Sequence, residues 1–192
     1  MCLETAPVGL SLIHIYVADE LPDNVIEKRR AAIKAQNPEG ILLGEVWEDA
    51  TNKESYGYHR RYALGRGLDS VMNYPLRNHI VSYLLGRESA QAFSAFLADQ
   101  ASNYPPPMYY ALMNLLSSHD IARIHTELGA QAPIDEMDRE QQAGFRLTIG
   151  QSREAAQLQR LAAVIQFMLP GVPSIYYGDE VGMDGEIGRA HV

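Results

Sequence analysis

The chain has 192 residues, of which 46% are hydrophobic and 21% charged, a balance that supports a packed core and excludes a disordered or collagen-like chain. With 16 Lys and Arg against 24 Asp and Glu, the net charge of −8 gives no electrostatic basis for binding nucleic acid or an anionic membrane. The single cysteine, Cys2, excludes an internal disulfide and a cysteine-based zinc cluster. No apolar run reaches the roughly 20 residues of a membrane helix, and residues 1–12 lack a secretory signal, so we expect a cytoplasmic protein unless a truncated start hides a signal.

The first part of the chain alternates helical and strand-like patterns. A weak strand signal lies near residues 12–17, and apolar positions at helical spacing predict a helix over residues 23–36 with Asp23 as its N-cap. The apolar run 40–47 follows a turn signal and is typical of a parallel strand buried on both faces. Residues 48–67 are polar and too long for a simple turn, so we expect a loop that shapes a binding site.

The same alternation continues to the end of the chain. The expected elements are a strand over 68–74, helices over 75–85 and 89–100, a break at Pro105, Pro106 and Pro107, a strand-like segment from Met108 to Ser118, a helix from near Ile121, an acidic loop over 129–142, a helix over 153–169, and a strand over 172–177. Strands that alternate with amphipathic helices indicate right-handed βα units around a parallel sheet, either open or closed into a barrel. A complete (β/α)₈ barrel needs about 250 residues, so this chain is too short to close one.

Glu45 is the first candidate catalytic residue. It follows a predicted buried strand, and the carboxyl ends of barrel strands display active-site groups. Trp47 stands two residues on, and beside an aromatic wall a carboxyl group is partly desolvated and can hold a proton near neutral pH, as a general acid requires. A solvated or capping glutamate is the alternative, and the pattern alone does not separate the two.

His119 and Asp120 form the second candidate, again where a strand-like segment leads into a helix. They have the chemistry to bond sugar hydroxyls and to stabilise developing positive charge, but Asp120 as a helix N-cap is the default interpretation. Tyr176, Tyr177 and the turn at Gly178 favour wall packing over sugar stacking. His59, His79 and His125 lack metal-ligand spacing, so no metal site is predicted.

Three motifs in order resemble the α-amylase family of retaining α-glucan hydrolases: GEVWEDA at 44–50, SHDIAR at 118–123 and PGVPSIYYGDEVGMDG at 170–185. The resemblance runs from about Val17 to Gly185 and implies a partial TIM barrel, α/β in class, covering roughly strands four to eight. It makes Glu45 the general acid/base, Asp120 the transition-state stabiliser, and His119 and Trp47 substrate-binding residues. It implies no required cofactor, and this segment gives no support for a structural calcium.

The resemblance also exposes a gap at the nucleophile. Retaining hydrolysis needs a second carboxylate about 5 Å from the acid. The family aspartate falls on Tyr16 and the family arginine on His14, and neither side chain can substitute, so we expect the chain as written to be inactive.

Residues 10–15 and 187–192 read like translated adapter DNA, and the resemblance stops abruptly at each. We therefore predict a foreign or artefactual segment over residues 1–15, barrel residues 16–186, and an artefactual end over 187–192.

Within the family, the segment 44–57 looks most like neopullulanases, cyclomaltodextrinases and maltogenic amylases, which implies α-glucan oligosaccharides, pullulan or cyclodextrins as substrates and allows a homodimer for the full-length enzyme. Two alternatives stay open. One is a catalytically inactive amylase-like binding protein with a genuine Tyr16, and the other is a transglycosylase of the same family.

Overall fold

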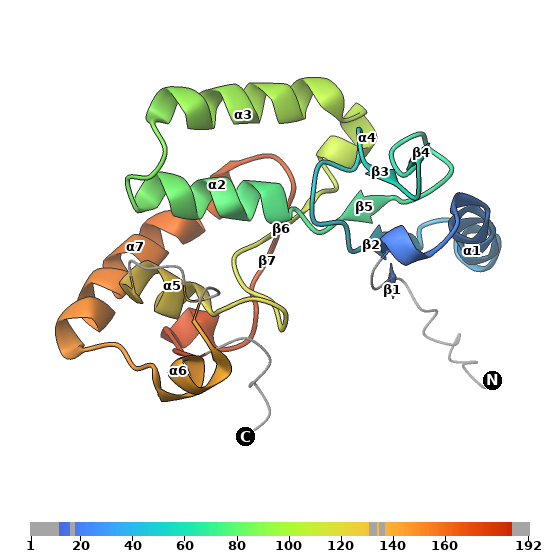
Figure 1. Cartoon of the computed structure of the whole chain (residues 1–192). Helices are drawn as coiled ribbons and strands as arrows, with labels where there is room; N and C mark the ends of the chain where they lie inside the picture. Colours follow the sequence, from blue (N-terminus) through green and yellow to red (C-terminus); the bar gives the residue numbers. More distant parts are fainter. Residues whose placement is uncertain (1–11, 16–17, 131–133, 135–136, 186–192) are drawn as a thin grey trace, which may run out of the picture. The chain divides into compact units, whose positions relative to one another are not determined.

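The computed structural model describes residues 12–15, 18–130, 134 and 137–185. The chain divides into two compact units (Figure 1). The first contains the residues up to Tyr74 together with Asp99–Met113, and the second contains Pro75–Ala98 and the residues from Asn114 onward. Each unit is described by itself.

A three-stranded parallel sheet lies at the centre of the first unit. Its order is β1 (Leu12–Ile15), β2 (Ile41–Gly44) and β5 (Ser70–Val71), and Leu12 pairs with Ile41 in the register. The helix α1 (Asp23–Gln36) connects β1 to β2, so the predicted βα unit is confirmed. The weak strand signal therefore corresponds to a real strand over 12–15, while Tyr16 and Val17 lie outside the described residues.

The start of α1 differs from the prediction. Pro22 is its N-cap, no side chain caps it, and Asp23 is the first helical residue. The Asp23 carboxylate instead accepts hydrogen bonds from Arg60 at 2.9 Å and from Arg61 at 3.2 Å. Asp23 was therefore wrongly predicted as the cap, because two guanidinium groups outside the helix take its oxygens.

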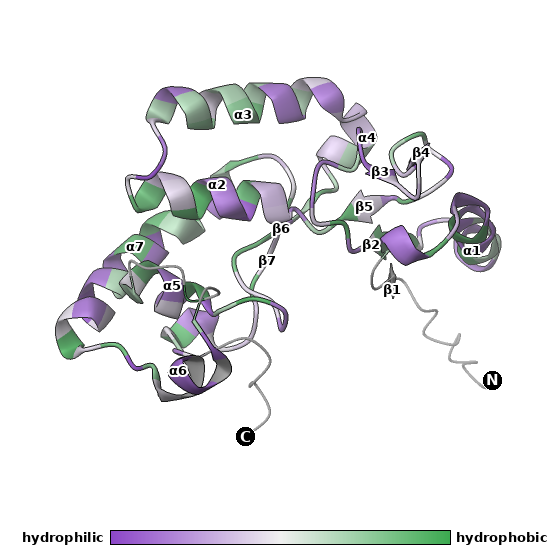
Figure 2. Cartoon of the chain, in the orientation of Figure 1, coloured by the Kyte–Doolittle hydropathy of each residue, from purple (hydrophilic) through white to green (hydrophobic). Residues whose placement is uncertain are grey.

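The predicted loop over residues 48–67 contains a small hairpin. Strands β3 (Glu54–Ser55) and β4 (Tyr58–His59) pair antiparallel across a two-residue turn. The 3₁₀ turn η1 (Ala18–Glu20) precedes α1. The hydrophobic core of the unit contains Ala18, Ile26, Ile33, Leu42, Val46, Ala50, Tyr62, Ala63, Leu68, Val71, Tyr104, Met108 and Leu112. Most of α1 is hydrophilic (Figure 2), and within that helix Ile26 and Ile33 are the buried residues.

The proline run behaves differently from the expectation. Helix α3 (Ala90–Asn103) does end before it, but the short helix α4 (Pro106–Tyr109) begins inside it. Pro106 and Pro107 occupy the first turn of α4. Proline is tolerated there because the backbone amides of a first turn have no acceptor within the helix, so the N–H group that proline lacks would form no intrahelical hydrogen bond.

Helices dominate the second unit. They are α2 (Tyr74–Leu84), α5 (Ile124–Ala130), α6 (Arg139–Gly144) and α7 (Ile149–Met168). The part of α3 up to Ala98 also belongs to this unit. Their apolar faces enclose a core of Leu76, Ile80, Val81, Phe93, Leu116, Ile124, Leu128 and Ala162. Helix α7 begins four residues before the predicted start because Thr148 and Gln151 form a capping box.

Two further predictions were inaccurate in this unit. The acidic segment 129–142 is not all loop, since α5 extends to Ala130 and α6 begins at Arg139. Helix α5 begins at Ile124, later than expected, because residues 119–121 form a turn and bend.

Strand β6 (Met113–Leu115) pairs with β7 (Val172–Ser174). Within the first unit, Met113 makes a parallel bridge to Met72. The strands β1, β2, β5, β6 and β7 lie at the positions predicted for strands. Among the described residues, no helix combines the length and apolar character needed to cross a membrane.

Candidate active site

Glu45 directly follows β2 and is 5% exposed. Its backbone carbonyl accepts a hydrogen bond from the Ala18 amide at 3.1 Å, which ties the strand end to η1. The Trp47 indole Nε1 donates to Glu45 Oε1 at 3.1 Å. The carboxyl group is thus buried and held by a hydrogen bond from an aromatic ring.

Trp47 is itself held by a second ring. It stacks on Tyr74, with the ring centroids 4.0 Å apart and the planes 6° from parallel. Tyr74 is 1% exposed, whereas Trp47 is 41% exposed. One face of the indole is therefore packed, while a substantial part of the ring remains open to a ligand.

The Leu68 side chain packs directly against the backbone before Glu45. A Cβ on Gly44 would lie 2.3 Å from Leu68 Cδ1, closer than atoms can pack. After Glu45, the buried amide of Ala50 donates to the Tyr104 hydroxyl at 2.9 Å. The hydrogen bond to Tyr104 holds the segment that follows Glu45.

His119 and Asp120 lie together in the second unit. His119 Nε2 is 3.3 Å from Asp120 Oδ2, and their side chains are 49% and 35% exposed. The Asp120 amide donates to Ser118 Oγ at 3.1 Å, so Asp120 sits in a tight polar turn. Asp120 does not cap α5, whose first amide, that of Ile124, donates to Ser117 Oγ at 3.0 Å. The N-cap interpretation of Asp120 is wrong.

A polar cluster that the sequence reasoning missed supports this turn. The Ser117 hydroxyl donates to Asp179 Oδ1 at 3.0 Å, and burial raises the pKa of Asp179. Arg123 is 5% exposed, and its Nη1 donates to the Tyr177 carbonyl and lies 3.7 Å from Asp179 Oδ1. Ser117, two residues before His119, was an available signal, because serine is favoured at helix starts and its Oγ accepts the Ile124 amide of α5.

Tyr176 and Tyr177 contact the same arginine. The Arg123 guanidinium lies 5.1 Å from the Tyr176 ring centroid and 4.5 Å from that of Tyr177. Gly178 has a φ of 85° and precedes the 3₁₀ turn η3 (Asp179–Val181). These contacts agree with the packing and turn role that the sequence favours for this segment.

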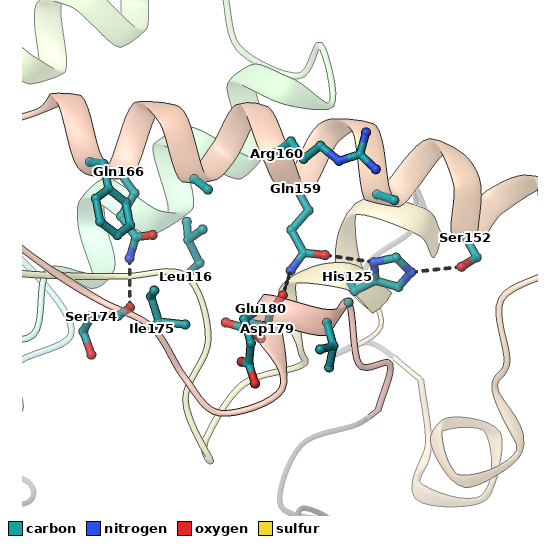
Figure 3. Close-up of a pocket in the computed structure, with 15 residues that line it drawn as sticks. Leu116, His125, Ser152, Gln159, Arg160, Gln166, Ser174, Ile175, Asp179 and Glu180 are labelled. Atoms are coloured by element: carbon teal, nitrogen blue, oxygen red, sulfur yellow. Dashed lines mark hydrogen bonds between the residues drawn. The ribbon is translucent and has the colours of Figure 1, made fainter.

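A hollow of about 490 Å³ runs along α7 in the second unit (Figure 3). His125 lines this hollow, and its Nδ1 lies 2.9 Å from Gln159 Oε1 and its Nε2 3.0 Å from Ser152 Oγ. Gln159 Nε2 donates to the Asp179 carbonyl at 2.7 Å, and Gln166 Nε2 donates to Ser174 O at 2.9 Å. The side chains of His125, Gln159 and Gln166 are therefore held by hydrogen bonds within this wall and act as scaffold.

Within the described ranges, no three His, Cys, Asp or Glu side chains are grouped so that they could hold a metal ion. The histidines have other contacts: His59 Nε2 is 3.0 Å from Thr51 O, and His79 Nδ1 is 2.8 Å from Glu88 Oε1. The structure thus brings Glu45 together with Trp47, and His119 together with Asp120. Each pair belongs to its own unit, and Tyr16 lies outside the described residues.

Comparison with known proteins gives consistent matches. The family model described as alpha amylase, catalytic domain, matches residues 14–191. A cyclomaltodextrinase of Thermoanaerobacter pseudethanolicus is 34% identical over 171 residues, which cover 88% of this chain and 24% of that protein. Neopullulanase 2 of Thermoactinomyces vulgaris is 32% identical over 178 residues, covering 92% of this chain and 25% of that protein.

Solved structures agree. The type III pullulan hydrolase from Thermococcus kodakarensis matches with a TM-score of 0.73 and 26% identity, covering 93% of this chain and 28% of that one. The chain spans about a quarter of the length of the two curated relatives.

Proposed function

Because the chain belongs to the α-amylase family, we propose that it is the part of the catalytic barrel carrying strands four to eight of a retaining α-glucan hydrolase that cleaves α-1,4-glucosidic bonds. Starch-derived oligosaccharides, pullulan and cyclodextrins are the proposed substrates, in keeping with the names of the relatives. The observation that carries the proposal is the buried Glu45 carboxyl at the end of a parallel strand, held by the Trp47 indole.

Each site residue has a separate role in this chemistry. Glu45 protonates the glycosidic oxygen as the bond to the anomeric carbon breaks, and later takes a proton from the attacking water. Asp120 stabilises the positive charge that develops on the sugar ring, and His119 bonds a sugar hydroxyl. Trp47 orients Glu45 and offers its open face to the substrate. The proposal requires Glu45 and Asp120 to converge on one cleft in the complete barrel.

The chain as written lacks the nucleophile that one step of this mechanism requires. Retention needs a nucleophile about 5 Å from the acid, and the family position holds Tyr16, with His14 in place of the arginine. Without the glycosyl-enzyme, hydrolysis should be lost by several orders of magnitude. Tyr16 is the observation that favours the alternative of an inactive amylase-like binding protein, and a glycosyl-enzyme captured by sugar would make the full-length enzyme a transglycosylase.

A binding and an activity measurement test the proposal together. Trp47 is the only tryptophan, so its emission reports on the environment of Glu45. Maltotriose, pullulan fragments and β-cyclodextrin should change this emission, and cellotriose should not. Reducing-end assays with the same three substrates should show no turnover above a Glu45→Gln control.

The outcomes are distinct. No change in Trp47 emission with any α-glucan would refute the proposed site, and turnover above the Glu45→Gln control would refute the role of the missing nucleophile. Re-sequencing the source DNA across codon 16 separates the two functions, since an aspartate supports the enzyme and a confirmed tyrosine supports the binding protein.

A further inference from the structure

Arg60 is a buried cation that directly follows β4, in the loop after Glu45. Its side chain is only 5% exposed. Burying a charge is costly unless the charge is paired and its donors are satisfied. The contacts of the Arg60 guanidinium therefore indicate which part of the unit this buried charge stabilises.

Three of these contacts are with backbone carbonyls of the segment that leads into α1. Nη1 of Arg60 donates to the Asp19 carbonyl at 2.8 Å. Nη2 donates to the Leu21 carbonyl and, at 3.5 Å, to the Ala18 carbonyl. A 3₁₀ turn as short as η1 has few internal hydrogen bonds, so a partner that satisfies its carbonyls determines where it lies.

The remaining two N–H groups bind side chains. Nε of Arg60 donates to Asp23 Oδ1 at 2.9 Å, and Nη1 also donates to Ser55 Oγ at 2.6 Å. Burial alone would raise the pKa of Asp23, but the hydrogen bonds from Arg60 and Arg61 outweigh it and lower the pKa. The carboxylate is therefore charged and compensates the guanidinium. All five N–H groups of Arg60 have acceptors, which is the full donor capacity of an arginine.

Ala18 connects this arginine to the candidate acid. Its carbonyl accepts the hydrogen bond from Arg60, and its amide donates to the Glu45 carbonyl at 3.1 Å. The Glu45 carboxyl group in turn accepts the Trp47 indole N–H at 3.1 Å. A displacement of η1 therefore acts directly on the backbone of Glu45, because the same residue of η1 bonds both groups.

A lysine at position 60 cannot reproduce this arrangement. Its ammonium group carries three N–H donors at one point, whereas a guanidinium spreads five over a rigid plane. The acceptors of Arg60 come from η1, α1 and β3, through Asp19, Asp23 and Ser55. The planar fork is therefore required by the positions of the acceptors and not by the charge alone.

Two contacts should keep η1 attached when Arg60 is replaced. The Tyr62 hydroxyl donates to Asp19 Oδ1 at 2.7 Å, and Lys53 Nζ lies 3.0 Å from Asp19 Oδ2. Neither contact involves Arg60. A lysine at position 60 should therefore displace the carbonyls of the turn without releasing the turn from the loop.

We propose that Arg60 is a positioning residue for the candidate active site, which fixes η1 against the strand end that carries Glu45. The turn begins two residues after Tyr16, the nucleophile position of the family resemblance. Arg60 acts through Ala18 and not through contact with a substrate. Its functional meaning rests on the proposed function of the chain, whereas the positioning is a property of the first unit.

The test compares the whole chain as wild type, Arg60→Lys, Arg61→Lys and Ile26→Val. Arg61→Lys is the matched control, because the Arg61 side chain is 54% exposed and binds the carboxylates of Asp23 and Glu27. Ile26→Val is the stability control, because Ile26 is a fully buried residue of α1 and the change removes one buried methylene group.

Three NMR signals are followed in each form. The Ala18 amide and the indole Nε1–H of Trp47, the only tryptophan, report on the positions that Arg60 holds. The Leu42 amide, which donates to Asp69 Oδ2 at 2.9 Å, reports on the stability of the unit.

In Arg60→Lys, the Ala18 amide should exchange roughly ten- to 100-fold faster, because hydrogen bonds from a charged group to its turn are lost. Exchange at Leu42 should rise less, and the indole signal should shift. Arg61→Lys should leave all three signals as in wild type. Ile26→Val should accelerate exchange at Ala18 and Leu42 by the same factor and leave the indole signal in place.

An indole signal in Arg60→Lys that coincides with that of wild type overturns the proposal, because Arg60 would then contribute stability alone. Equal acceleration at Ala18 and Leu42 in that variant overturns it for the same reason. The emission response of wild-type Trp47 to maltotriose decides the proposed function separately. If that response is absent while Arg60→Lys shifts the indole signal and selectively exposes Ala18, the positioning role stands and the active-site proposal fails.

Discussion

Removing the hydroxyl of Tyr104 tests how the segment after Glu45 is held. Tyr104 is 4% exposed, and its hydroxyl accepts the amide of Ala50, which is 0% exposed. Burial and the nearby Asp49 carboxylate raise the pKa of Tyr104, so the phenol stays neutral. In Tyr104→Phe, the ring keeps its packing and only the oxygen is lost.

The expected cost follows from the buried amide. A buried donor left without a partner costs about 1–3 kcal/mol, and Ala50 is 0% exposed. At 1.4 kcal/mol for each factor of ten, the amide should exchange roughly five- to 150-fold faster. The matched variant Tyr110→Phe removes an exposed hydroxyl and should change the exchange rate little.

Hydrogen exchange followed by NMR at the Ala50 amide measures this directly. The Leu42 amide, which donates to Asp69 Oδ2 at 2.9 Å, is the internal reference and should be unaffected. If Ala50 exchanges within twofold of wild type in Tyr104→Phe, the phenol does not hold this segment and the reasoning is refuted.

Three further results are expected. Gly44→Ala should shift the Trp47 emission and destabilise the first unit by about 1–3 kcal/mol, because the new Cβ would collide with Leu68; unchanged emission and stability would contradict this. Burial raises the pKa of Asp179 above 3.8, so the stability that its neutral form contributes is complete below that pH and is lost as the pH rises through the raised pKa. In Asp179→Asn the side chain is always neutral, so the Ile124 amide should be protected from hydrogen exchange more than in wild type at pH 7 but not at pH 3, after correction for intrinsic exchange. Protection equal to that of wild type at both pH values would be inconsistent with this reasoning. The isolated chain should self-associate and unfold without a sharp transition, since a partial barrel leaves a strand edge and helix faces uncovered; a monomer with a cooperative melt by calorimetry would disprove the half-barrel interpretation.

Local sequence patterns were sufficient for the elements that carry strong periodicity. The apolar run before Glu45 and the stripe of α7 identify β2 and α7 because burial of an entire face selects the residues of that face. The strand-end position of Glu45 follows from the same apolar run, and the sequence placed Trp47 two residues on, where the structure shows their hydrogen bond.

Local sequence patterns could not predict contacts between residues that lie far apart in the chain. Whether Asp23 caps α1 depends on Arg60 and Arg61, which lie 37 and 38 residues away, and whether Asp120 caps α5 depends on Ser117 taking the helix amide first. A carboxylate beside a helix start has the same local signature in either case. Only the folded chain decides which donor reaches it, because hydrogen-bond partners are chosen by distance in space rather than along the sequence.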